Sequence, residues 1–361
     1  MKIVFTAPRY APLVGGVETH TQALANRLVT RGHDVVVVTT NPAGDLAAQE
    51  TIDGVTILRV PSWPKRGDPF VARGVGAFVN ELSPDLVHVQ GYQSAFTPMV
   101  LAGVTRTNVP TLLTFHGGAN ANALRQALYP LQRRVLAHWL RHVSKLVVLT
   151  HFERELYARE LRVPTSSFVT IPNGCDLPEP RTSRQPHLIV SAGRLDPAKG
   201  HERVIAAFAL LHARNSSTRL RIVGGGPDRD RLQAVVNQLT LNDVVEFQTF
   251  DATQRQEFSD SLNEGGVVIS MSRAETQPIT LLEAARLGCN IGVSTASEGL
   301  QELVDEKIAW GISPEASDIE LTDLIEASLK SPFSPSQQNL KTWDEVVATT
   351  EILYSQLVEN H

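Results

Sequence analysis

Short apolar runs alternate with helical patterns along the chain. Near-continuous β-branched runs, such as residues 35–38, predict strands that are apolar on both faces, as in a parallel sheet covered by helices. The first half predicts strands at Lys2–Ala7, Asp34–Thr39, Val55–Val60, Asp85–Gln90, Pro110–Phe115, Lys145–Leu149 and Phe168–Ile171. Between the first two, leucine and alanine recur at helical spacing over Val17–Arg31, so this region predicts a βαβ unit.

The second half repeats this rhythm after a proline-rich segment, Pro178–Pro186, that has the composition of a linker. Its predicted strands are His187–Ala192, Leu220–Val223, Val244–Phe247, Gly266–Ser270, Asn290–Val293 and Ile308–Ile312. Its predicted helices are His201–Ala213, Asp228–Leu239, Thr253–Leu262, Ile279–Leu287 and Ile319–Leu329. The pattern predicts two doubly wound α/β domains in tandem, 1–178 and 179–339.

Composition supports this architecture and excludes several classes of protein. The chain has 361 residues, 42% of them hydrophobic and 20% charged, which suits two globular domains and excludes a disordered or fibrous chain. No apolar stretch is long enough for a membrane span, and the apolar start is too short for a signal peptide. Two cysteines, Cys175 and Cys289, provide no zinc ligand set, and we expect a reducing, cytoplasmic setting.

Charge is divided unevenly between the halves. The net charge of −5 argues against a protein that coats nucleic acid. Residues 1–178 carry 17 Lys and Arg against 12 Asp and Glu, whereas residues 179–361 carry 16 against 26. A basic first half is thus joined to an acidic second half.

Ligands of doubly wound sheets bind outside the carboxyl ends of the strands. After the first strand, Gly15-Gly16 precede a helix and would let a phosphate or sugar approach its N–H groups, unless they form a plain turn. The spacing is not that of a dinucleotide fingerprint. His116 ends another strand before Gly117-Gly118, which favours a role in binding over a purely structural histidine.

Three loops of the second half carry the strongest candidates for anion binding. Gly193-Arg194 end a strand, and Lys199-Gly200 precede the next helix, so both cations can converge on a diphosphate. Gly224-Gly225 follow another strand and could support a phosphate or nucleoside. Asp228 and Asp230 form a D-x-D pair, which we interpret as the acidic first turn of a helix rather than a metal site.

The most distinctive motif is a pair of glutamates around a helix start. Glu275 follows a buried strand, Gln277-Pro278-Ile279 begin a helix, and Glu283 lies within that helix. The helix N-terminus between them offers N–H groups to a diphosphate, Glu275 would meet a sugar, and Glu283 would accept hydrogen bonds from ribose hydroxyls. The bland alternative is two solvent-exposed glutamates.

Taken in order along the chain, these motifs resemble the retaining glycosyltransferases of family four, which have the two-domain GT-B fold. The resemblance rests on Gly15-Gly16, His116, residues 171–176 (IPNGCD), Gly193-Arg194, Lys199-Gly200, Gly224–Pro227 and Glu275-x7-Glu283. It extends to Asn339–Leu357, which resembles the family's closing helix and would return residues 340–361 to the first domain. The chain departs from the family at Gln277-Pro278, where Phe-Gly is common, and at Thr249, where glycine is common.

The resemblance implies a role for each residue. Gly15 and Gly16 would approach the donor or acceptor, His116 would contact the donor sugar, and Asn173 and Asp176 would line the cleft or shape the hinge. Arg194 and Lys199 would hold the diphosphate, with Gly193, Gly224, Gly225, Gln277, Pro278 and Ile279 beside it. Glu275 would hold sugar hydroxyls and Glu283 the ribose. No metal or other cofactor is implied.

The expected activity is transfer of a hexose-type sugar, with retained configuration, from a UDP-sugar or alternatively a GDP-sugar to a hydroxyl of a lipid-linked, polysaccharide or small-molecule acceptor. A GT-B epimerase or phosphorylase-like enzyme and an idle GT-B binding subunit are the alternatives, and a nicotinamide dehydrogenase is the weakest. Basic and apolar residues mix over Asn120–Lys145, which suits either peripheral contact with an anionic membrane or an ordinary amphipathic helix.

Overall fold

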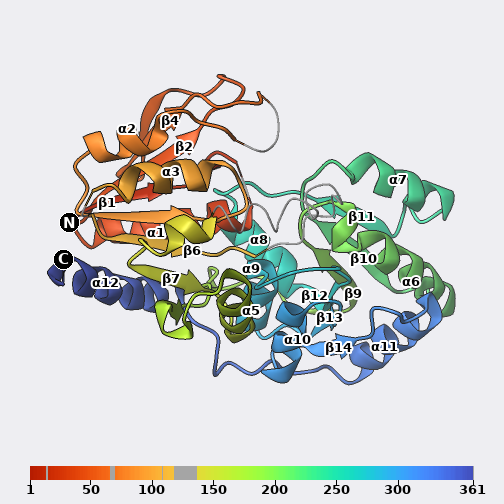
Figure 1. The fold of residues 1–361 in the computed structure, drawn as a ribbon. Helices are drawn as coiled ribbons and strands as arrows, with labels where there is room; N and C mark the ends of the chain where they lie inside the picture. The colour runs from red at the N-terminus through yellow and green to blue at the C-terminus, as the bar shows by residue number, and fades with distance from the viewer. Residues whose placement is uncertain (14, 66–69, 108, 118–135, 361) are drawn as a thin grey trace. The chain divides into compact units, whose positions relative to one another are not determined.

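The computed structural model describes residues 1–13, 15–65, 70–107, 109–117 and 136–360. They form two compact units (Figure 1): unit 1 comprises Met1–Asn173 and Trp343–His361, and unit 2 comprises Gly174–Thr342. The proline-rich segment Pro178–Pro186 therefore lies inside unit 2. There the backbone N–H of Arg181 donates to Asp260 at 2.6 Å and Ser259 donates to the carbonyl of Pro178 at 2.6 Å, so the segment is fastened to its own unit.

Unit 1 is built on an eight-stranded sheet with the order β3-β4-β2-β1-β5-β6-β7-β8. Its strands are β1 (Lys2–Thr6), β2 (Asp34–Thr40), β3 (Gln49–Ile52), β4 (Val55–Val60), β5 (Leu86–Gln90), β6 (Thr111–Thr114), β7 (Lys145–Val148) and β8 (Phe168–Thr170). All neighbours pair in parallel except β3, which the sequence analysis missed and which joins β4 through a hairpin at Asp53-Gly54. Both turn residues have positive φ, as a tight hairpin requires.

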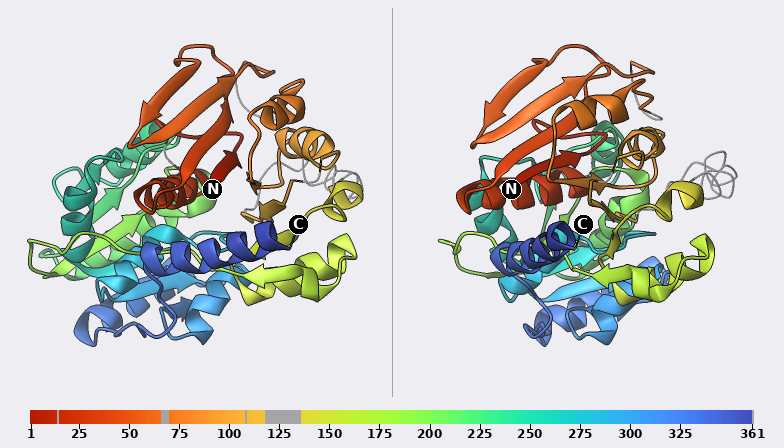
Figure 2. Two further views of the ribbon diagram at one scale, coloured as in Figure 1. Left: turned by 90° about the vertical axis from the view of Figure 1, so that its left-hand side faces the viewer. Right: turned by 60° about the vertical axis from the view of Figure 1, so that its left-hand side comes forward.

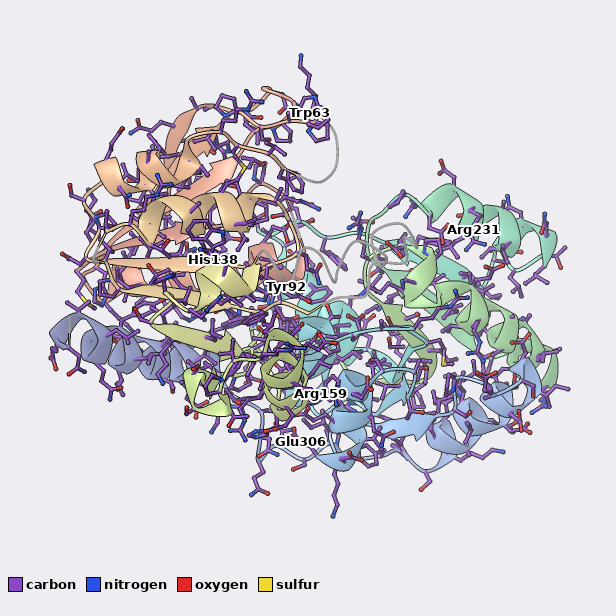
Figure 3. All side chains as sticks on the ribbon, in the orientation of Figure 1. Trp63, Tyr92, His138, Arg159, Arg231 and Glu306 are labelled. Atoms are coloured by element: carbon purple, nitrogen blue, oxygen red, sulfur yellow. The ribbon has the colours of Figure 1, made fainter. Side chains whose placement is uncertain are left out.

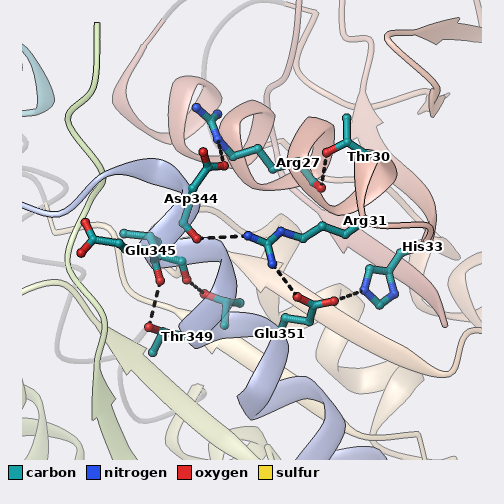
Figure 4. Close-up of polar contacts among 10 residues, drawn as sticks. Arg27, Thr30, Arg31, His33, Asp344, Glu345, Thr349 and Glu351 are labelled. Atoms are coloured by element: carbon teal, nitrogen blue, oxygen red, sulfur yellow. Dashed lines mark hydrogen bonds and ion pairs between the residues drawn. The ribbon is translucent and has the colours of Figure 1, made fainter.

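Five helices of unit 1 have defined bounds: α1 (Gly16–Thr30), α2 (Val75–Glu81), α3 (Phe96–Val104), α5 (His151–Leu161) and α12 (Trp343–Glu359). The C-terminal α12 packs against α1, as expected (Figure 2). Arg27 pairs with Asp344 at 3.0 Å, and Glu351 accepts from Arg31 at 3.0 Å and from His33 at 2.8 Å (Figure 4). The hydrogen bond from His33, followed by that from Arg31, lowers the pKa of Glu351.

Unit 2 is built on a six-stranded parallel sheet with the order β11-β10-β9-β12-β13-β14. Its strands are β9 (Gln185–Ala192), β10 (Arg219–Val223), β11 (Val245–Gln248), β12 (Gly265–Ser270), β13 (Ile291–Ser294) and β14 (Trp310–Ile312). Its helices are α6 (His201–Arg214), α7 (Arg229–Gln238), α8 (Arg255–Asn263), α9 (Ile279–Arg286), α10 (Glu298–Asp305) and α11 (Asp318–Lys330).

Neighbouring positions of the central strand show why this sheet is covered on both faces. Leu188 and Val190 of β9 belong to one apolar cluster, with residues of α8, α9 and α10. Ile189, between them, belongs to the opposite cluster, with residues of α6, α7 and α11. Successive side chains of a strand point to opposite faces, so an uninterrupted apolar run needs helices on both. This confirms the predicted doubly wound α/β architecture.

The remaining expectations concern membrane spans, the basic and apolar segment Asn120–Lys145 and the two cysteines. No helix in the described ranges is both long and apolar enough to cross a membrane. The segment Asn120–Lys145, proposed as an acceptor or membrane contact, falls largely outside the described residues, as does Gly118. Cys175 and Cys289 are both buried.

Candidate functional site

The structure of unit 2 brings two predicted motifs into direct contact. Lys199, at the end of a short 3₁₀ turn (Pro197–Lys199), donates a hydrogen bond to Oε1 of Glu275, in the loop after β12. Both side chains are partly open to solvent, with exposed fractions of 28% for Lys199 and 17% for Glu275. Asp196 fixes the turn by accepting from the backbone N–H of Ala198 at 2.9 Å. A cation and a carboxylate are thus held side by side at the carboxyl ends of β9 and β12.

Glycines let these loops approach so closely. Gly200 has a φ of +72°, and a Cβ there would lie 2.1 Å from the carbonyl oxygen of Met271. A Cβ on Gly224 would lie 1.9 Å from the carbonyl oxygen of Gly193. The sequence analysis attributed Gly193 and Gly224 to close approach of a ligand. Packing of one loop on another already requires a glycine at Gly224.

Arg194 and Gly225, in these same loops, are exposed to solvent. The Arg194 side chain is exposed, and no ion pair of its guanidinium occurs among the described residues. The backbone of Arg194 is fixed by His201, whose Nε2 donates to its carbonyl oxygen at 3.2 Å and whose Nδ1 accepts from Ser191 at 2.9 Å. Burial is the main cause that lowers the pKa of His201, so this brace is a neutral imidazole. The sequence analysis did not identify His201.

The loop that carries Glu275 is held by the start of α10. Ser297 accepts from the backbone N–H of Glu275 at 3.2 Å and donates to its carbonyl oxygen at 3.0 Å. Pro278 caps the next helix, which begins at Ile279 as predicted, and Gln277 lies half-buried before it. The N-terminus of α9 therefore follows the Glu275 loop directly, and its free N–H groups are a favourable place for an anion.

Glu283, one turn into α9, is almost completely buried, with 2% of its side chain exposed. Burial raises its pKa to about 7, opposed by the charge of Arg255 and increased by the charge of Asp176. Arg255, the first residue of α8, donates to Oε1 of Glu283, and its own side chain is 38% exposed. The alternative of two solvent-exposed glutamates is therefore wrong for Glu283, and its contact with Arg255 was not predicted from the sequence.

In unit 1, His116 lies just beyond β6 and is part of a buried polar cluster. Its Nε2 lies 2.7 Å from Oε1 of Gln90, which ends the neighbouring β5. Its ring packs edge-on against that of His20, with 4.7 Å between the ring centroids. Burial, followed by the nearby His20 and His88, lowers the pKa of His116 well below its ordinary value. His116 therefore offers a neutral imidazole at the end of the sheet.

Asn173 belongs to this same cluster. Its Oδ1 accepts from Nδ1 of His20 at 2.8 Å, and the His20 ring lies edge-on to Trp343, the first residue of α12. Asn173 is the last residue of unit 1 before the chain enters unit 2. Asp176 belongs to unit 2, where its charge acts on Glu283. The structure thus assigns contacts to both residues, which the resemblance placed at a cleft or hinge.

The two glycines at the start of α1 have different surroundings. Gly15 is the N-cap of α1, and a Cβ there would lie 2.4 Å from a carboxylate oxygen of Glu18. Glu18 is buried and accepts from Arg9 at 3.0 Å. A Cβ on Gly16 would meet no atom within 4 Å among the described residues. The space beside the first helical N–H groups of unit 1 is therefore at Gly16.

The D-x-D pair of unit 2 forms an ion pair with arginine. Asp228 is the N-cap of α7, and Arg231 lies on that helix (Figure 3). Both carboxylate oxygens of Asp228 accept from Arg231, at 2.6 and 2.9 Å. The Arg231 contact is the main cause that lowers the pKa of Asp228. Among the described residues, no group of three or more His, Cys, Asp or Glu side chains has the arrangement of a metal site.

Comparison with known protein families accounts for nearly the whole chain. Residues 14–179 match the model described as Glycosyltransferase Family 4, and residues 177–342 match that described as Glycosyl transferases group 1. Among curated proteins, the phosphatidylinositol N-acetylglucosaminyltransferase gpi3 subunit of Schizosaccharomyces pombe is 23% identical, over 96% of this chain and 79% of that protein.

Solved structures show the same fold. Sucrose-phosphate synthase from Thermosynechococcus elongatus superposes with a TM-score of 0.80 at 19% identity, over 100% of both chains. Anabaena Alr3699/HepE in complex with UDP and glucose superposes with a TM-score of 0.74 at 17% identity, over 98% of this chain and 99% of that one. These neighbours have the GT-B fold. The chain belongs to glycosyltransferase family 4 and is a retaining hexosyltransferase of the GT-B fold that uses a nucleotide-sugar donor.

Proposed function

We propose that this enzyme transfers a hexose-type sugar from a UDP-sugar to a hydroxyl group of a glycan, lipid-linked or small-molecule acceptor, without a metal ion. A GDP-sugar is the alternative donor. The preference for UDP is supported by the solved neighbour that holds UDP and glucose, and the preference for a hexose by the N-acetylglucosaminyltransferase relative.

The contact between Lys199 and Glu275 carries this proposal. It places a cation for a diphosphate next to a carboxylate for sugar hydroxyls, and the N-terminus of α9 begins a few residues later. Arg194, exposed near the start of the loop that also carries Lys199, adds a second cation. A diphosphate carries about two or more negative charges, so two cations and a helix N-terminus offer it matching charge. Donor binding would replace the Lys199–Glu275 ion pair with contacts to the ligand.

The reaction breaks the bond between the anomeric carbon and the β-phosphate oxygen, and forms a bond from that carbon to the acceptor oxygen on the same face. The departing phosphate oxygen takes the proton of the acceptor hydroxyl. Arg194, Lys199 and the N-terminus of α9 would stabilise the negative charge that develops on the diphosphate. Because these groups supply the positive charge themselves, the proposal assigns no step to a metal ion.

The remaining candidate residues would position the substrates. His116 would offer its neutral imidazole to a sugar hydroxyl, and Gly16 would let the acceptor or donor approach the start of α1. Glu283 would accept hydrogen bonds from the ribose. Asn173 and Asp176 would shape the region where the chain passes from one unit to the other. The basic character of residues 1–178 suits an anionic acceptor, including one bound to a lipid at a membrane surface.

A donor panel tests the proposal. We would measure release of UDP or GDP from UDP-glucose, UDP-galactose, UDP-N-acetylglucosamine and GDP-mannose, with crude lipids and oligosaccharides as acceptors. We expect one UDP-sugar to be consumed only when an acceptor is present, and nuclear magnetic resonance to show retained anomeric configuration. Chelation with EDTA should leave the rate unchanged.

Matched lysine variants supply the control. Lys199→Ala should lower kcat by about 10²–10³-fold, the usual cost of one group that stabilises transition-state charge. Lys330→Ala removes an exposed lysine of α11 that pairs with Glu326, and should leave kcat unchanged. A Lys199→Ala enzyme with near-normal kcat, or a panel in which only GDP-sugars are consumed, would contradict the corresponding part of the proposal.

A further inference from the structure

Arg255 and Glu283 form an ion pair with an unusual division of exposure. The carboxylate is the buried partner, with 2% of its side chain exposed, and the guanidinium is the open one, with 38% exposed. Arg255 also lies over the ring of Phe258, 5.4 Å from the ring centroid, which holds the guanidinium at the start of α8. Solvent therefore reaches the guanidinium of Arg255, which lies directly beside the buried carboxylate of Glu283.

A second buried ion pair in unit 2 shows the opposite arrangement. Arg221 is 9% exposed, whereas its partners Glu246 and Glu264 are 50% and 20% exposed. The buried guanidinium of Arg221 also donates to the carbonyl of Ser261 at 3.2 Å, so it is satisfied within the fold. In the described part of the chain, Arg255 is the one hydrogen-bond partner of the Glu283 carboxylate, and it engages Oε1. The Glu283 carboxylate can thus accept further hydrogen bonds, whereas Arg221 and its partners are satisfied within the fold.

A buried carboxylate needs a nearby cation to remain charged. Two charged groups act on Glu283: Arg255 of α8, which favours the charged form, and Asp176, from the segment after β8, which disfavours it. The strand β13 also packs against α9 but carries no titratable residue over Ile291–Ser294. Loss of Arg255 would leave burial and Asp176 unopposed, so the pKa of Glu283 would rise further and the neutral acid would become its main form at neutral pH.

We propose that Arg255 is a positioning residue for nucleotide binding, which orients Glu283 and favours its charged form so that its carboxylate accepts hydrogen bonds from the ribose hydroxyls of the donor. This inference rests on the proposed role of Glu283 in the nucleotide-sugar site. A charged acceptor forms hydrogen bonds roughly twice as strong as a neutral one, and a protonated carboxyl group loses acceptor capacity. Arg255 acts on the ribose only through Glu283.

Binding of ribonucleotides and deoxyribonucleotides tests this role. We would measure Kd by calorimetry for UDP and 2′-deoxy-UDP, or for the guanine pair if GDP binds, between pH 6.5 and 9. Arg255→Gln should weaken UDP binding by about 10–100-fold at pH 7, the cost of a hydrogen bond to a charged group, and bring the Kd of UDP close to that of 2′-deoxy-UDP. The preference for UDP should return as the pH rises, because Glu283 ionises again.

Three further variants separate positioning from folding. Arg255→Lys should keep most of the preference for ribose, because it keeps the positive charge. Arg286→Gln changes an exposed arginine on the helix of Glu283 and should match the unmodified protein at every pH. Glu283→Gln should lose the preference at all pH values. With saturating acceptor and varied donor, Arg255→Gln should raise the KM for the donor far more than it lowers kcat.

The outcomes distinguish the proposed role of Arg255 from the proposed role of Glu283. If Glu283→Gln loses the ribose preference but Arg255→Gln keeps it at pH 7, the role of Arg255 is wrong and that of Glu283 stands. Equal weakening of UDP and 2′-deoxy-UDP by Arg255→Gln, with no recovery at high pH, would also overturn the proposal. If the unmodified protein does not distinguish UDP from 2′-deoxy-UDP, the ribose role of Glu283 fails, and that of Arg255 fails with it.

Discussion

The loops that follow the strands are built differently in the two units. In unit 2, the groups at and after the strand ends are charged. Lys199 pairs with Glu275, both partly open to solvent, the open Arg255 pairs with the buried Glu283, and Arg194 is exposed. Each of these pairs leaves one or both partners within reach of a ligand. A partly exposed ion pair contributes little to stability, so contacts with a ligand can replace the contact between its two side chains.

In unit 1, the described histidine cluster beside β5 and β6 is neutral and buried. His88 is bonded by Tyr354 on one nitrogen, at 2.5 Å, and by Thr114 on the other, at 2.6 Å. His20 is bonded to Asn173 and His116 to Gln90, all within a buried cluster. The difference indicates a division of labour: the described charged groups of unit 2 are suited to hold an anionic ligand, and the buried histidine cluster of unit 1 is a fixed, neutral part of the fold.

The largest expected effect concerns the exposed charge in unit 2. Arg194→Ala should lower kcat for sugar transfer by about 10²–10³-fold, because one source of positive charge for the departing diphosphate is removed. The free energy of unfolding should change by no more than about 0.5 kcal/mol, since the side chain is exposed. Arg286→Ala, at another exposed arginine, is the control for both measurements. Near-normal transfer by Arg194→Ala would remove the functional half of the comparison.

Much of this arrangement follows from the sequence, because apolar runs and strand-end motifs are local properties. The runs at 35–38 and 188–192 predicted buried parallel strands, and the glycine, proline and glutamate around Pro278 predicted the start of α9. The strand β3 was missed because Gln49–Ile52 is an edge strand, exposed or half-buried along its length, with no apolar run. Its one local indication was Asp53-Gly54, a turn typical of hairpins.

The partners of the site residues could not be predicted in the same way. Ser297 lies 22 residues from Glu275, and Arg255 lies 28 residues from Glu283, and both contacts depend on how the elements of unit 2 pack. No spacing in the sequence encodes that packing. Gly224 was predicted to support a phosphate or nucleoside, and the contact that requires a glycine there, with the Gly193 carbonyl, could not be predicted from the sequence.

The next largest effect should come from mild acid, which should lower the stability of unit 1 more than that of unit 2. Burial lowers the pKa of His20 to about 4, that of His88 to about 3, and that of His116 well below its ordinary value, so all three stay neutral when native. Below about pH 6.5 the unfolded chain gains protons that native unit 1 does not. Each histidine then lowers the free energy of unfolding by about 1.4 kcal/mol per pH unit.

The free energy of unfolding of unit 2 should fall less over the same pH range. Its His201 acts in the same direction, because its pKa is lowered, but Glu283 acts in the opposite one. The raised pKa of Glu283 means that the native state binds a proton between about pH 7 and 4.5 that the unfolded chain does not, which stabilises unit 2 as the pH falls. Hydrogen exchange at pH 7.5 and 5 should show a larger loss of protection in β1, β5 and β6 than in β9 and β12.

A histidine variant isolates the cause. His20→Asn should reduce the pH dependence of unit 1 by about one third, whereas His187→Asn, at an exposed position, should leave it unchanged. Equal loss of protection in both units, or a His20→Asn variant with the original slope, would show that the buried histidines do not set the acid response.

The smallest effect should come from the link between α12 and the buried cluster. Tyr354 is fully buried, and its hydroxyl is the partner of Nδ1 of His88. Tyr354→Phe keeps the ring and removes that partner, so it should lower the free energy of unfolding by about 1–3 kcal/mol, the cost of an unsatisfied buried polar group. Urea denaturation should show a lower midpoint with an unchanged m value.

A position on the same helix provides the control. Ile352 is 61% exposed, so Ile352→Ser should change the midpoint far less than Tyr354→Phe does. The Tyr354→Phe enzyme should also keep its affinity for the donor, because the groups proposed to hold the nucleotide belong to unit 2. If the variant instead lost donor affinity while its stability was unchanged, the fixed cluster of unit 1 would have a direct part in donor binding, and the division between a ligand-exchanging unit and a rigid one would have to be abandoned.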